Sequence, residues 1–246
     1  MFQTERIEAI INILKQNGYV TVKYLTEELH YSNATINRDL NMMKKQKLIK
    51  RSYGGVELID RQDISLPFRY HKMKSAKNKI GQKAAEFVQD GDTIFVDAST
   101  TTEFLGKHLT DKKDITVITN NMALVMFLSE YNINIICLGG SVVEAPCMLM
   151  GTDTISNAMH YHADKAFFST GAISSKGTIG GCDTYYMLHQ IMIENAKQSF
   201  FLADHDKIDK PYQLIHTLSE GDYIITDYHF DAAVKGKYKY ITFVEI

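Results

Sequence analysis

Residues 32–45 read SNATINRDLNMMKK, and this stretch predicts a helix with one apolar face and one polar, basic face. Ser32 is a favoured N-cap residue, because its hydroxyl can accept a hydrogen bond from a backbone N–H of the first turn. Ile36, Leu40 and Met43 recur at helical spacing and predict the buried face. The outer face is then formed by Asn33, Thr35, Asn37, Arg38, Asn41, Lys44 and Lys45.

Two shorter helices are predicted before this stretch and two strands after it. Apolar residues at helical spacing begin at Ile7, and Gly18 ends that first helix. A second helix is expected over residues 22–29, followed by a tight break at His30-Tyr31. Residues 48–58 read LIKRSYGGVEL, which predicts two short strands around a Gly-Gly turn. This order is that of a helix-turn-helix with a wing.

The outer face of the third helix has the chemistry that a DNA groove requires. Asn and Arg can make paired hydrogen bonds to adenine and guanine edges, and lysines suit phosphates. The alternative is a three-helix bundle whose polar face is only solvated. Six Lys and Arg against one Asp over residues 38–51 favour the nucleic-acid interpretation. The expected DNA-binding residues are Ser32, Asn33, Thr35, Asn37, Arg38, Lys44, Arg51, Tyr53 and Gly54.

The distribution of charge along the 246 residues indicates that the two ends of the chain have different functions. Residues 1–83 carry 16 Lys and Arg against 8 Asp and Glu, whereas residues 84–246 carry 11 against 21. A basic segment of this kind suits a polyanionic partner. No apolar run reaches the roughly 18 residues of a membrane span, and the polar N-terminus does not resemble a secretory signal. We therefore expect a cytoplasmic protein that has no membrane contact.

The cysteines predict neither a disulfide framework nor a metal site. Cys137, Cys147 and Cys182 are widely and irregularly spaced, unlike zinc ligands. Reduced thiols are the simplest expectation in the cytosol. Asp204-His205-Asp206 alternates possible ligands on one loop, but such residues rarely converge, so we expect a solvated turn. No metal and no cofactor are expected.

The rest of the chain predicts a larger α/β domain. We expect the winged helix-turn-helix over residues 1–60, a polar and basic linker over 61–74 that contains Pro67, and the α/β domain over 75–246. A helix is expected over about residues 75–88. Strands are expected at 93–97, 115–119, 133–138, 165–169, 199–203 and 223–226, and helices at 102–109, 122–131 and 184–197. Such alternation predicts a mostly parallel sheet covered by helices.

Polar or glycine-containing loops follow these strands. Asp97-Ala98-Ser99-Thr100-Thr101-Thr102 follows the first strand and leads into a helix, where hydroxyls and backbone N–H groups can hold an anion such as phosphate. Later loops hold Asn120, Gly139-Gly140, Gly171 and residues 203–207. Ligands of parallel α/β sheets bind beyond the carboxyl ends of the strands. We therefore expect a small polar ligand at this edge.

Two sets of motifs resemble the DeoR family of bacterial regulators over nearly the whole chain. The first set is Glu5-Arg6, Gly18, Thr35-Ile36-Asn37-Arg38-Asp39-Leu40, Arg51 and Tyr53-Gly54-Gly55. The second set is Asp97 to Thr102, Thr119-Asn120, Gly139-Gly140, Asp164-Lys165-Ala166-Phe167, Gly171, Asp183, Met192-Ile193-Glu194, Ala203-Asp204 and Lys207.

The resemblance implies a sensor domain similar in fold to ribose-5-phosphate isomerase, with phosphorylated sugars or related metabolites as effectors. It implies that residues 99–102 hold the phosphate. The expected effector-binding residues are Asp97, Ser99, Thr100, Thr101, Thr102, Asn120, Gly140, Gly171, Asp183 and Lys207.

The chain departs from the family pattern at several positions. The family usually has a second arginine at Asn37, which implies an operator sequence of its own for this chain. Glycine is frequent at the position of Ser99. Many relatives have arginine at Val143, an acidic residue at Tyr185 and lysine at His189. A lone helical histidine is more often structural than a ligand contact, so His189 is not included in the expected site.

The leading hypothesis is a homo-oligomeric repressor of a sugar or carbohydrate operon, released from double-stranded DNA by a phosphorylated sugar. The second hypothesis is an enzyme, a sugar-phosphate isomerase with an appended nucleic-acid module. Asp97, Asp183 and Lys207 could supply its acid, base and cation. No acid–base cluster at close sequence spacing supports an enzyme, so we expect none.

Overall fold

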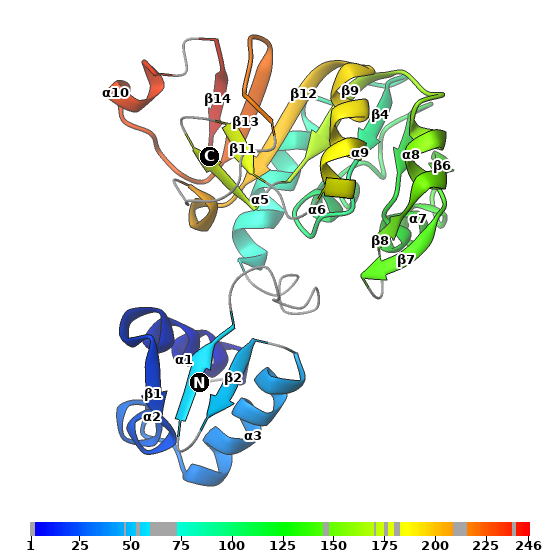
Figure 1. Ribbon diagram of the computed structural model, residues 1–246. Coiled ribbons are helices and arrows are strands. Elements are labelled where there is room, and N and C mark those ends of the chain that lie inside the picture. Colours follow the sequence, from blue (N-terminus) through cyan, green and yellow to red (C-terminus); the bar gives the residue numbers. More distant parts are fainter. Residues whose placement is uncertain are drawn as a thin grey trace. The chain divides into compact units, whose positions relative to one another are not determined.

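The structure, a computed structural model, divides the chain into two compact units, Met1–Lys72 and Met73–Ile246 (Figure 1). It describes residues 3–46, 48–52, 55–59, 73–144, 148–169, 171–174, 177–179, 183–208, 216–237 and 240–246. Most of the expected linker and two of the expected DNA-binding residues, Tyr53 and Gly54, lie outside these ranges.

In its described residues, the first unit has three helices and a small antiparallel sheet. Its elements are α1 (Gln3–Asn17), β1 (Tyr19–Thr21), α2 (Val22–Leu29), α3 (Asn33–Lys45), β2 (Ile49–Ser52) and β3 (Gly55–Leu58). The sheet has the order β1-β3-β2. The predicted helix-turn-helix and the two strands of the wing are thus confirmed. The short strand β1 is an addition that the sequence did not predict.

Local capping explains why α2 and α3 begin where they do. The Thr21 hydroxyl accepts a hydrogen bond from the Tyr24 N–H, and the Ser32 hydroxyl accepts one from the Thr35 N–H at 3.2 Å. His30, at the end of α2, has a φ of 55°, the left-handed conformation that turns the chain toward α3. The buried apolar side chains of α1, α2, α3 and the sheet form one core: Ile7, Ile10, Ile11, Leu14, Val20, Leu25, Ile36, Leu40, Met43, Leu48, Ile49 and Val56.

The second unit is built on a parallel sheet of seven strands in the order β14-β13-β12-β9-β4-β5-β6. Its strands are β4 (Thr93–Val96), β5 (Thr116–Thr119), β6 (Asn134–Cys137), β9 (Ala163–Phe168), β12 (Ala196–Ala203), β13 (Asp222–Thr226) and β14 (Thr242–Glu245). Its helices are α5 (Lys74–Ala85), α6 (Thr102–Gly106), α7 (Met122–Leu128), α8 (Thr152–Ala158), α9 (Asp183–Glu194), α10 (Ala232–Lys235) and the 3₁₀ turn η2 (His205–Lys207). The predicted mostly parallel α/β sheet is confirmed.

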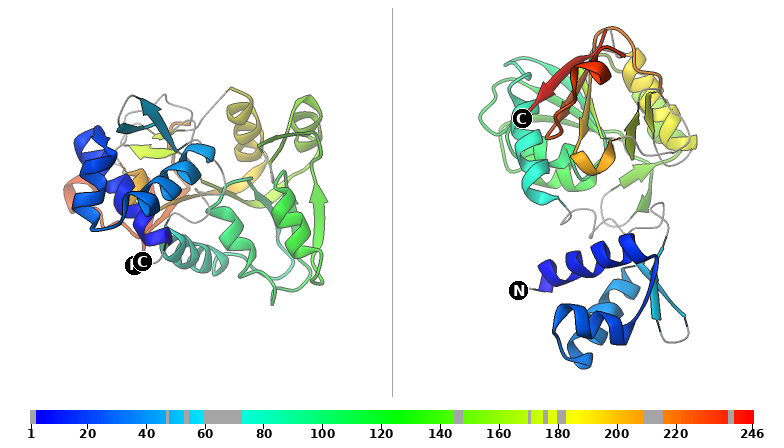
Figure 2. Two further views of the ribbon diagram at one scale, coloured as in Figure 1. Left: turned by 90° about the horizontal axis from the view of Figure 1, so that it is seen from below. Right: turned by 90° about the vertical axis from the view of Figure 1, so that its left-hand side faces the viewer.

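Both faces of this sheet are buried, which explains the nearly continuous apolar strands. Along β12, Phe200 and Leu202 belong to one core cluster, whereas Phe201 and Ala203 belong to the other. The helices α5, α6 and α7 pack on the first face, and α8 and α9 pack on the second (Figure 2, left). Phe200 stacks on Phe167 of β9 with ring centroids 4.8 Å apart, which joins adjacent strands within the first cluster.

Two short hairpins extend the second unit beyond the expected elements. They are β7 (Ser141–Glu144) with β8 (Met148–Met150), and β10 (Ala172–Ser174) with β11 (Gly177–Ile179). The predicted boundary after α9 is wrong, because Lys197 lies in β12 rather than in the helix.

The order of the strands creates a switch point at β4. The chain passes from β4 outward through β5 to β6, then returns to pair β9 on the other side of β4 and continues outward through β12, β13 and β14. Connections that leave adjacent strands in opposite directions open a crevice at their carboxyl ends, the usual ligand position in such sheets. The loops after β4 and β9 border this crevice. In the described part of the chain, no helix is long and apolar enough to span a membrane.

Candidate nucleic-acid interface and effector site

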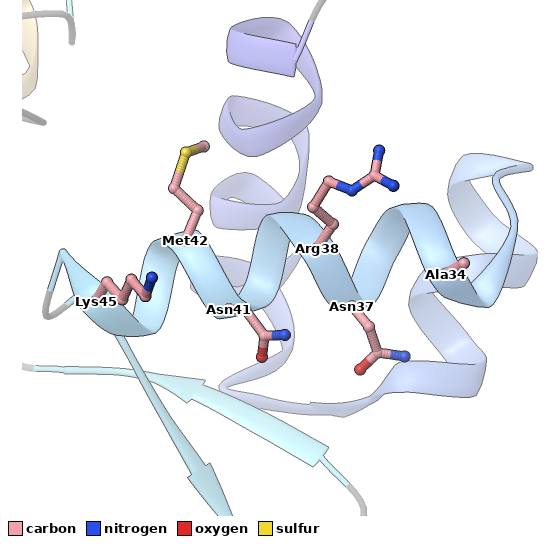
Figure 3. Close-up of a pocket in the computed structure, with 6 residues that line it drawn as sticks. All are labelled: Ala34, Asn37, Arg38, Asn41, Met42 and Lys45. Atoms are coloured by element: carbon pink, nitrogen blue, oxygen red, sulfur yellow. The ribbon is translucent and has the colours of Figure 1, made fainter.

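The outer face of α3 carries two rows of side chains (Figure 3). Asn37 and Asn41 project to the side on which the strands of the wing lie, whereas Arg38 and Met42 project to the opposite side. Together with Ala34 and Lys45, these four residues line a shallow pocket on the helix surface. The amide and basic side chains among these residues suit the base edges and phosphates of a duplex.

The structure gives the predicted DNA-binding residues different tasks. Ser32 and Thr35 are engaged with each other at the helix start, with their hydroxyl oxygens 2.9 Å apart. Arg38 and Lys44 are exposed on α3 and available to a duplex. The guanidinium of Arg51, on β2, donates hydrogen bonds to the side-chain oxygens of Asn37 and Asn41 and therefore lies against α3.

A buried ion pair, which the sequence interpretation did not assign, fastens α1 to α3. The Asp39 carboxylate is fully buried and accepts hydrogen bonds from Arg6 Nε at 2.5 Å, Arg6 Nη2 at 3.1 Å and Gln3 Nε2 at 2.9 Å. The Arg6 guanidinium also lies 4.7 Å from the centre of the Tyr31 ring. Hydrogen bonding to Asp39 raises the pKa of Arg6 above its already high usual value. Asp39, which stands beside Arg38 in the sequence, is therefore a structural residue.

In the second unit, the Asp97 carboxylate organises the loop after β4. It accepts hydrogen bonds from the Ser99 N–H at 3.2 Å and from the Thr102 hydroxyl at 2.7 Å. Its other oxygen accepts one from the Ser169 N–H at 3.0 Å, which ties this loop to the end of β9. Asp97 and Thr102 are fully buried. Both were predicted to bind the effector, and the structure engages both in shaping the loop.

Two lysines converge on the two middle hydroxyls of this loop. Lys77 Nζ donates to Thr100 Oγ1 at 2.9 Å. Lys207 Nζ donates to Thr101 Oγ1 at 3.3 Å and to Ser169 Oγ at 2.5 Å. A hydroxyl that accepts from an ammonium keeps its own proton for a further acceptor. Two cations and two such hydroxyls on neighbouring residues could hold an anion at the switch point.

Lys77 was not predicted, and its position depends on the packing of α5 against α6. Gly81 lies one turn after Lys77, and a Cβ at Gly81 would lie 2.6 Å from the backbone carbon of Phe104. The absence of a side chain therefore lets the two helices approach closely, which brings Lys77 to the loop. Lys77 is only 3% exposed, and a buried ammonium requires nearby partners or counter-charge. Burial raises the pKa of the neighbouring Glu103, while the positive charges of Lys107 and Lys77 oppose that rise.

His189 and Asn120 also lie beside this loop. His189 is buried on α9 with Nε2 3.3 Å from the Asp97 carboxylate, but this nitrogen makes no hydrogen bond with the residues that the structure describes, so its structural role stays a prediction. The Asn120 amide donates to the Leu149 carbonyl at 2.9 Å. Its oxygen is buried and has no hydrogen-bond partner among the residues that the structure describes. A buried acceptor of this kind can take a hydrogen bond from a ligand hydroxyl.

The remaining predicted effector residues are not all brought to the loop. Gly140 has a φ of 109°, and a Cβ there would lie 2.8 Å from the Met150 carbonyl oxygen and collide with the Thr154 hydroxyl. It is thus required for the packing of β8 and α8. Gly171 is exposed, and the side chain of Asp183 lies outside the described part of the structure.

The other candidate, the Asp204-His205-Asp206 triplet, makes a local contact. His205 Nδ1 lies 2.7 Å from Asp227, whose other oxygen accepts from the His205 N–H at 2.8 Å. This pair joins the loops after β12 and β13. Among the residues that the structure describes, no three His, Cys, Asp or Glu side chains are grouped so that they could hold a metal ion.

Comparisons with known proteins match both units. Residues 6–62 match the DeoR-like helix-turn-helix domain, and residues 72–228 match the DeoR C terminal sensor domain. The HTH-type transcriptional repressor GlcR of Bacillus subtilis is 37% identical over 92% of this chain and 89% of its own length. The glycerol-3-phosphate regulon repressor of Escherichia coli is 29% identical over 92% of each chain. The lactose phosphotransferase system repressor of Lactococcus lactis is 30% identical over 85% of each.

Solved structures that resemble this chain include proteins of other classes. Ribose 5-phosphate isomerase A of Methanocaldococcus jannaschii matches with a TM-score of 0.41 and 19% identity, over 56% of this chain and 55% of its own. The delta subunit of eIF2B from Chaetomium thermophilum matches with a TM-score of 0.48 and 12% identity, over 80% of this chain and 62% of its own.

Proposed function

The chain belongs to the DeoR family of transcriptional regulators, and from this premise we propose that it is a DNA-binding repressor of a sugar or carbohydrate operon that a phosphorylated sugar releases from DNA. The observation that carries the effector assignment is the convergence of Lys77 and Lys207 on the adjacent hydroxyls of Thr100 and Thr101. Charge-assisted hydrogen bonds of this kind suit a phosphate group.

The rest of the sugar would extend from the phosphate toward polar groups at the same edge of the sheet. Asn120 follows β5, which lies directly beside β4, and its buried oxygen can accept a hydrogen bond from a sugar hydroxyl. The remaining predicted residues, Ser99, Gly140, Gly171 and Asp183, stay proposals in this role. Such a ligand would bind more tightly than inorganic phosphate, because it would satisfy a further buried polar group.

For DNA binding, we propose that α3 enters the major groove and that the lysines and Arg38 contact phosphates and base edges. Two copies of the chain would present two recognition helices to successive major grooves, so a homo-oligomer is expected. The proposed target also places the protein in the cytoplasm. Relief of repression requires that the effector bind one arrangement of the oligomer more tightly than the other, with a coupling of ~1–3 kcal/mol.

The test uses the purified full chain and a duplex that spans the promoter region beside its own gene. We expect salt-sensitive, sequence-selective binding, which a subset of sugar phosphates weakens and the matching unphosphorylated sugars do not. The same compounds should raise the melting temperature of the second unit. No selective DNA binding would contradict the repressor, and no response to any phosphorylated sugar would contradict the effector.

Lysine variants make the test specific to the site. Lys77→Met and Lys207→Met should retain DNA binding and lose the response to sugar phosphate. Lys197→Met is the matched control, because Lys197 is exposed and pairs Asp164 at the opposite, amino-terminal edge of the sheet. It should respond like the unaltered protein.

The isomerase alternative is tested in the same samples. The Asp97 carboxylate already accepts hydrogen bonds from Ser99, Thr102 and Ser169, which argues against its service as a general base. We expect no turnover of pentose or hexose phosphates. Measurable turnover that is lost in Lys207→Met would favour the enzyme instead.

A further inference from the structure

One arginine of the wing donates hydrogen bonds to two asparagines of the recognition helix α3. Arg51 Nη1 donates to Asn41 Oδ1 at 2.8 Å, and Arg51 Nη2 donates to Asn37 Oδ1 at 2.6 Å. Asn37 and Asn41 lie one turn apart on α3, so the two ends of the guanidinium fork span that turn. The side chain of Arg51 is thereby fixed along the helix surface.

The backbone explains why Arg51 reaches α3 while its neighbour does not. Arg51 is paired with Val56 in the antiparallel ladder of β2 and β3, and residues directly opposite each other share one face of a sheet. Val56 is fully buried in the core of the first unit, so Arg51 leaves the strand on the core side. Lys50 lies on the other face, where it makes an exposed ion pair with Glu57 at 3.5 Å. Exposed pairs of this kind hold a side chain only weakly.

Asn37 uses both ends of its amide within the protein. Its oxygen accepts from Arg51, and its Nδ2 donates to the Asn33 carbonyl at 2.9 Å and to the Asn33 side chain. An asparagine that reads adenine must use its oxygen and its NH₂ group together on the base edge. To read adenine in this way, Asn37 would have to share or give up its contacts with Arg51 and Asn33. In contrast, the guanidinium has five N–H donors, and its contacts with the described residues Asn37 and Asn41 use two of them.

From these contacts we propose that Asn37 is a positioning residue and that Arg51, supplied by the wing, contacts DNA beside the recognition helix in the position that Asn37 and Asn41 set. The inference rests on the proposed repressor function. Arg51 presents its remaining N–H groups to an acceptor on DNA, either the guanine edge or a phosphate. Asn37 and Asn41 determine where that acceptor must lie.

The fold also supplies an internal control. Arg38 lies on the opposite side of α3 from Asn37 and Asn41, and it projects away from the wing (Figure 3). Its contact with DNA would not depend on Asn37. Effects of Arg38 and Asn37 on binding should therefore combine independently, whereas those of Arg51 and Asn37 should not.

The experiment starts by selecting duplexes from a random-sequence library with the full chain. Binding of the selected duplex and of its single-base variants is then measured for Asn37→Ala, Arg51→Ala, the double variant, Asn41→Ala and Arg38→Ala. We expect Arg51→Ala to weaken binding about tenfold and Asn37→Ala by about three- to tenfold. The double variant should bind no more weakly than Arg51→Ala alone. Arg38→Ala combined with Asn37→Ala should show the product of the two single effects.

The pattern of loss identifies the acceptor on DNA. If Arg51 contacts a guanine, Asn37→Ala and Arg51→Ala will both abolish the preference at the same base pair. If it contacts a phosphate, both will weaken binding equally on all sequences and reduce the salt slope by about one. Asn37→Asp provides a second measure, because it keeps the acceptor for Arg51. It should bind more weakly overall but retain the base preference of the unaltered protein.

Two results would overturn the inference. One is a change of preference in Asn37→Ala at a base pair that Arg51→Ala leaves unaffected, since Asn37 would then read DNA itself. The other is a double variant whose loss equals the product of the single losses. A chain that selects no sequence at all would instead contradict the repressor function. Unchanged far-ultraviolet circular dichroism confirms that each variant is folded.

Discussion

Removal of the Arg6 guanidinium should destabilise the first unit strongly and leave the second unit unchanged. Asp39 is fully buried, and Arg6 supplies two of the three hydrogen bonds that its carboxylate accepts. In Arg6→Ala, the Gln3 amide is the one donor to Asp39 that remains among the residues that the structure describes. Breaking a buried pair costs about 3–5 kcal/mol. Because the Arg6 side chain is 11% exposed and water can enter its place, we expect a value near the lower limit, about 3 kcal/mol.

Calorimetry of the full chain measures this change directly. The sequence contains no tryptophan, so heat absorption is a better signal than intrinsic fluorescence. For a unit of this size, 1 kcal/mol corresponds to roughly 4–8 °C, so the melting transition of the first unit should fall by about 12–24 °C. The transition of the second unit is the internal reference and should not move.

Further variants separate the ion pair from simple packing. Arg6→Lys keeps the positive charge but lacks the two-pronged guanidinium, so its free energy of unfolding should lie between those of the unaltered protein and Arg6→Ala. Replacement of both residues by leucine should cost less than Arg6→Ala, because no buried charge is then left without a partner. A loss below about 1 kcal/mol for Arg6→Ala, as found for surface pairs, would refute the reasoning.

Three other predictions concern the second unit. Asp164→Asn should lower the free energy of unfolding at pH 7, because hydrogen bonds from Lys197 and the Thr93 N–H lower the pKa of Asp164 in the folded protein. This stabilisation is present above the unfolded pKa near 3.8 and is lost as the pH falls through the folded pKa. The difference in unfolding free energy between the variant and the unaltered protein should therefore vanish in strong acid. Burial raises the pKa of Glu103 above its usual value of 4.5, so ionised Glu103 destabilises the folded protein at pH 7. Glu103→Gln should therefore raise the melting temperature at pH 7 and leave it unchanged below pH 4.5. A lower melting temperature of the variant at pH 7 would contradict this reasoning. Gly140→Ala should cost about 1–3 kcal/mol in denaturant unfolding, owing to the clash with Thr154, and a neutral result would contradict the packing assignment.

The elements that the sequence predicted well are those with local causes. The bounds of α2 and α3 agree with prediction because Thr21 and Ser32 cap them and apolar spacing defines the buried face. The central strands were predicted correctly because both of their faces are buried, so nearly all of their residues are apolar and stand out in the sequence. Strand β1 was missed because only its pairing with β3 makes three residues a strand. Strand β14 was also missed; it lies at the edge of the sheet, and none of its four residues is fully buried.

The candidate effector site was predictable only in part for a similar reason. Asp97 to Thr102 are contiguous, so their motif is visible in the sequence. Lys77 lies in a basic helix and looks like one of several solvated lysines until α5 packs against α6 at Gly81. In the same way, nothing local distinguishes Arg51 from Lys50; the ladder register decides which of them reaches α3.

The distance along the chain between Lys77 and Lys207 has a consequence for synthesis. A ribosome that adds about 5–20 residues per second needs roughly 7–26 seconds to pass from the first lysine to the second. The whole of Met1–Lys72 has by then been made. A nascent chain therefore carries the whole helix-turn-helix unit for several seconds before the proposed phosphate site can exist. During that interval the proposed effector has no complete site at which to act, so under the proposed function only the finished polypeptide responds to it.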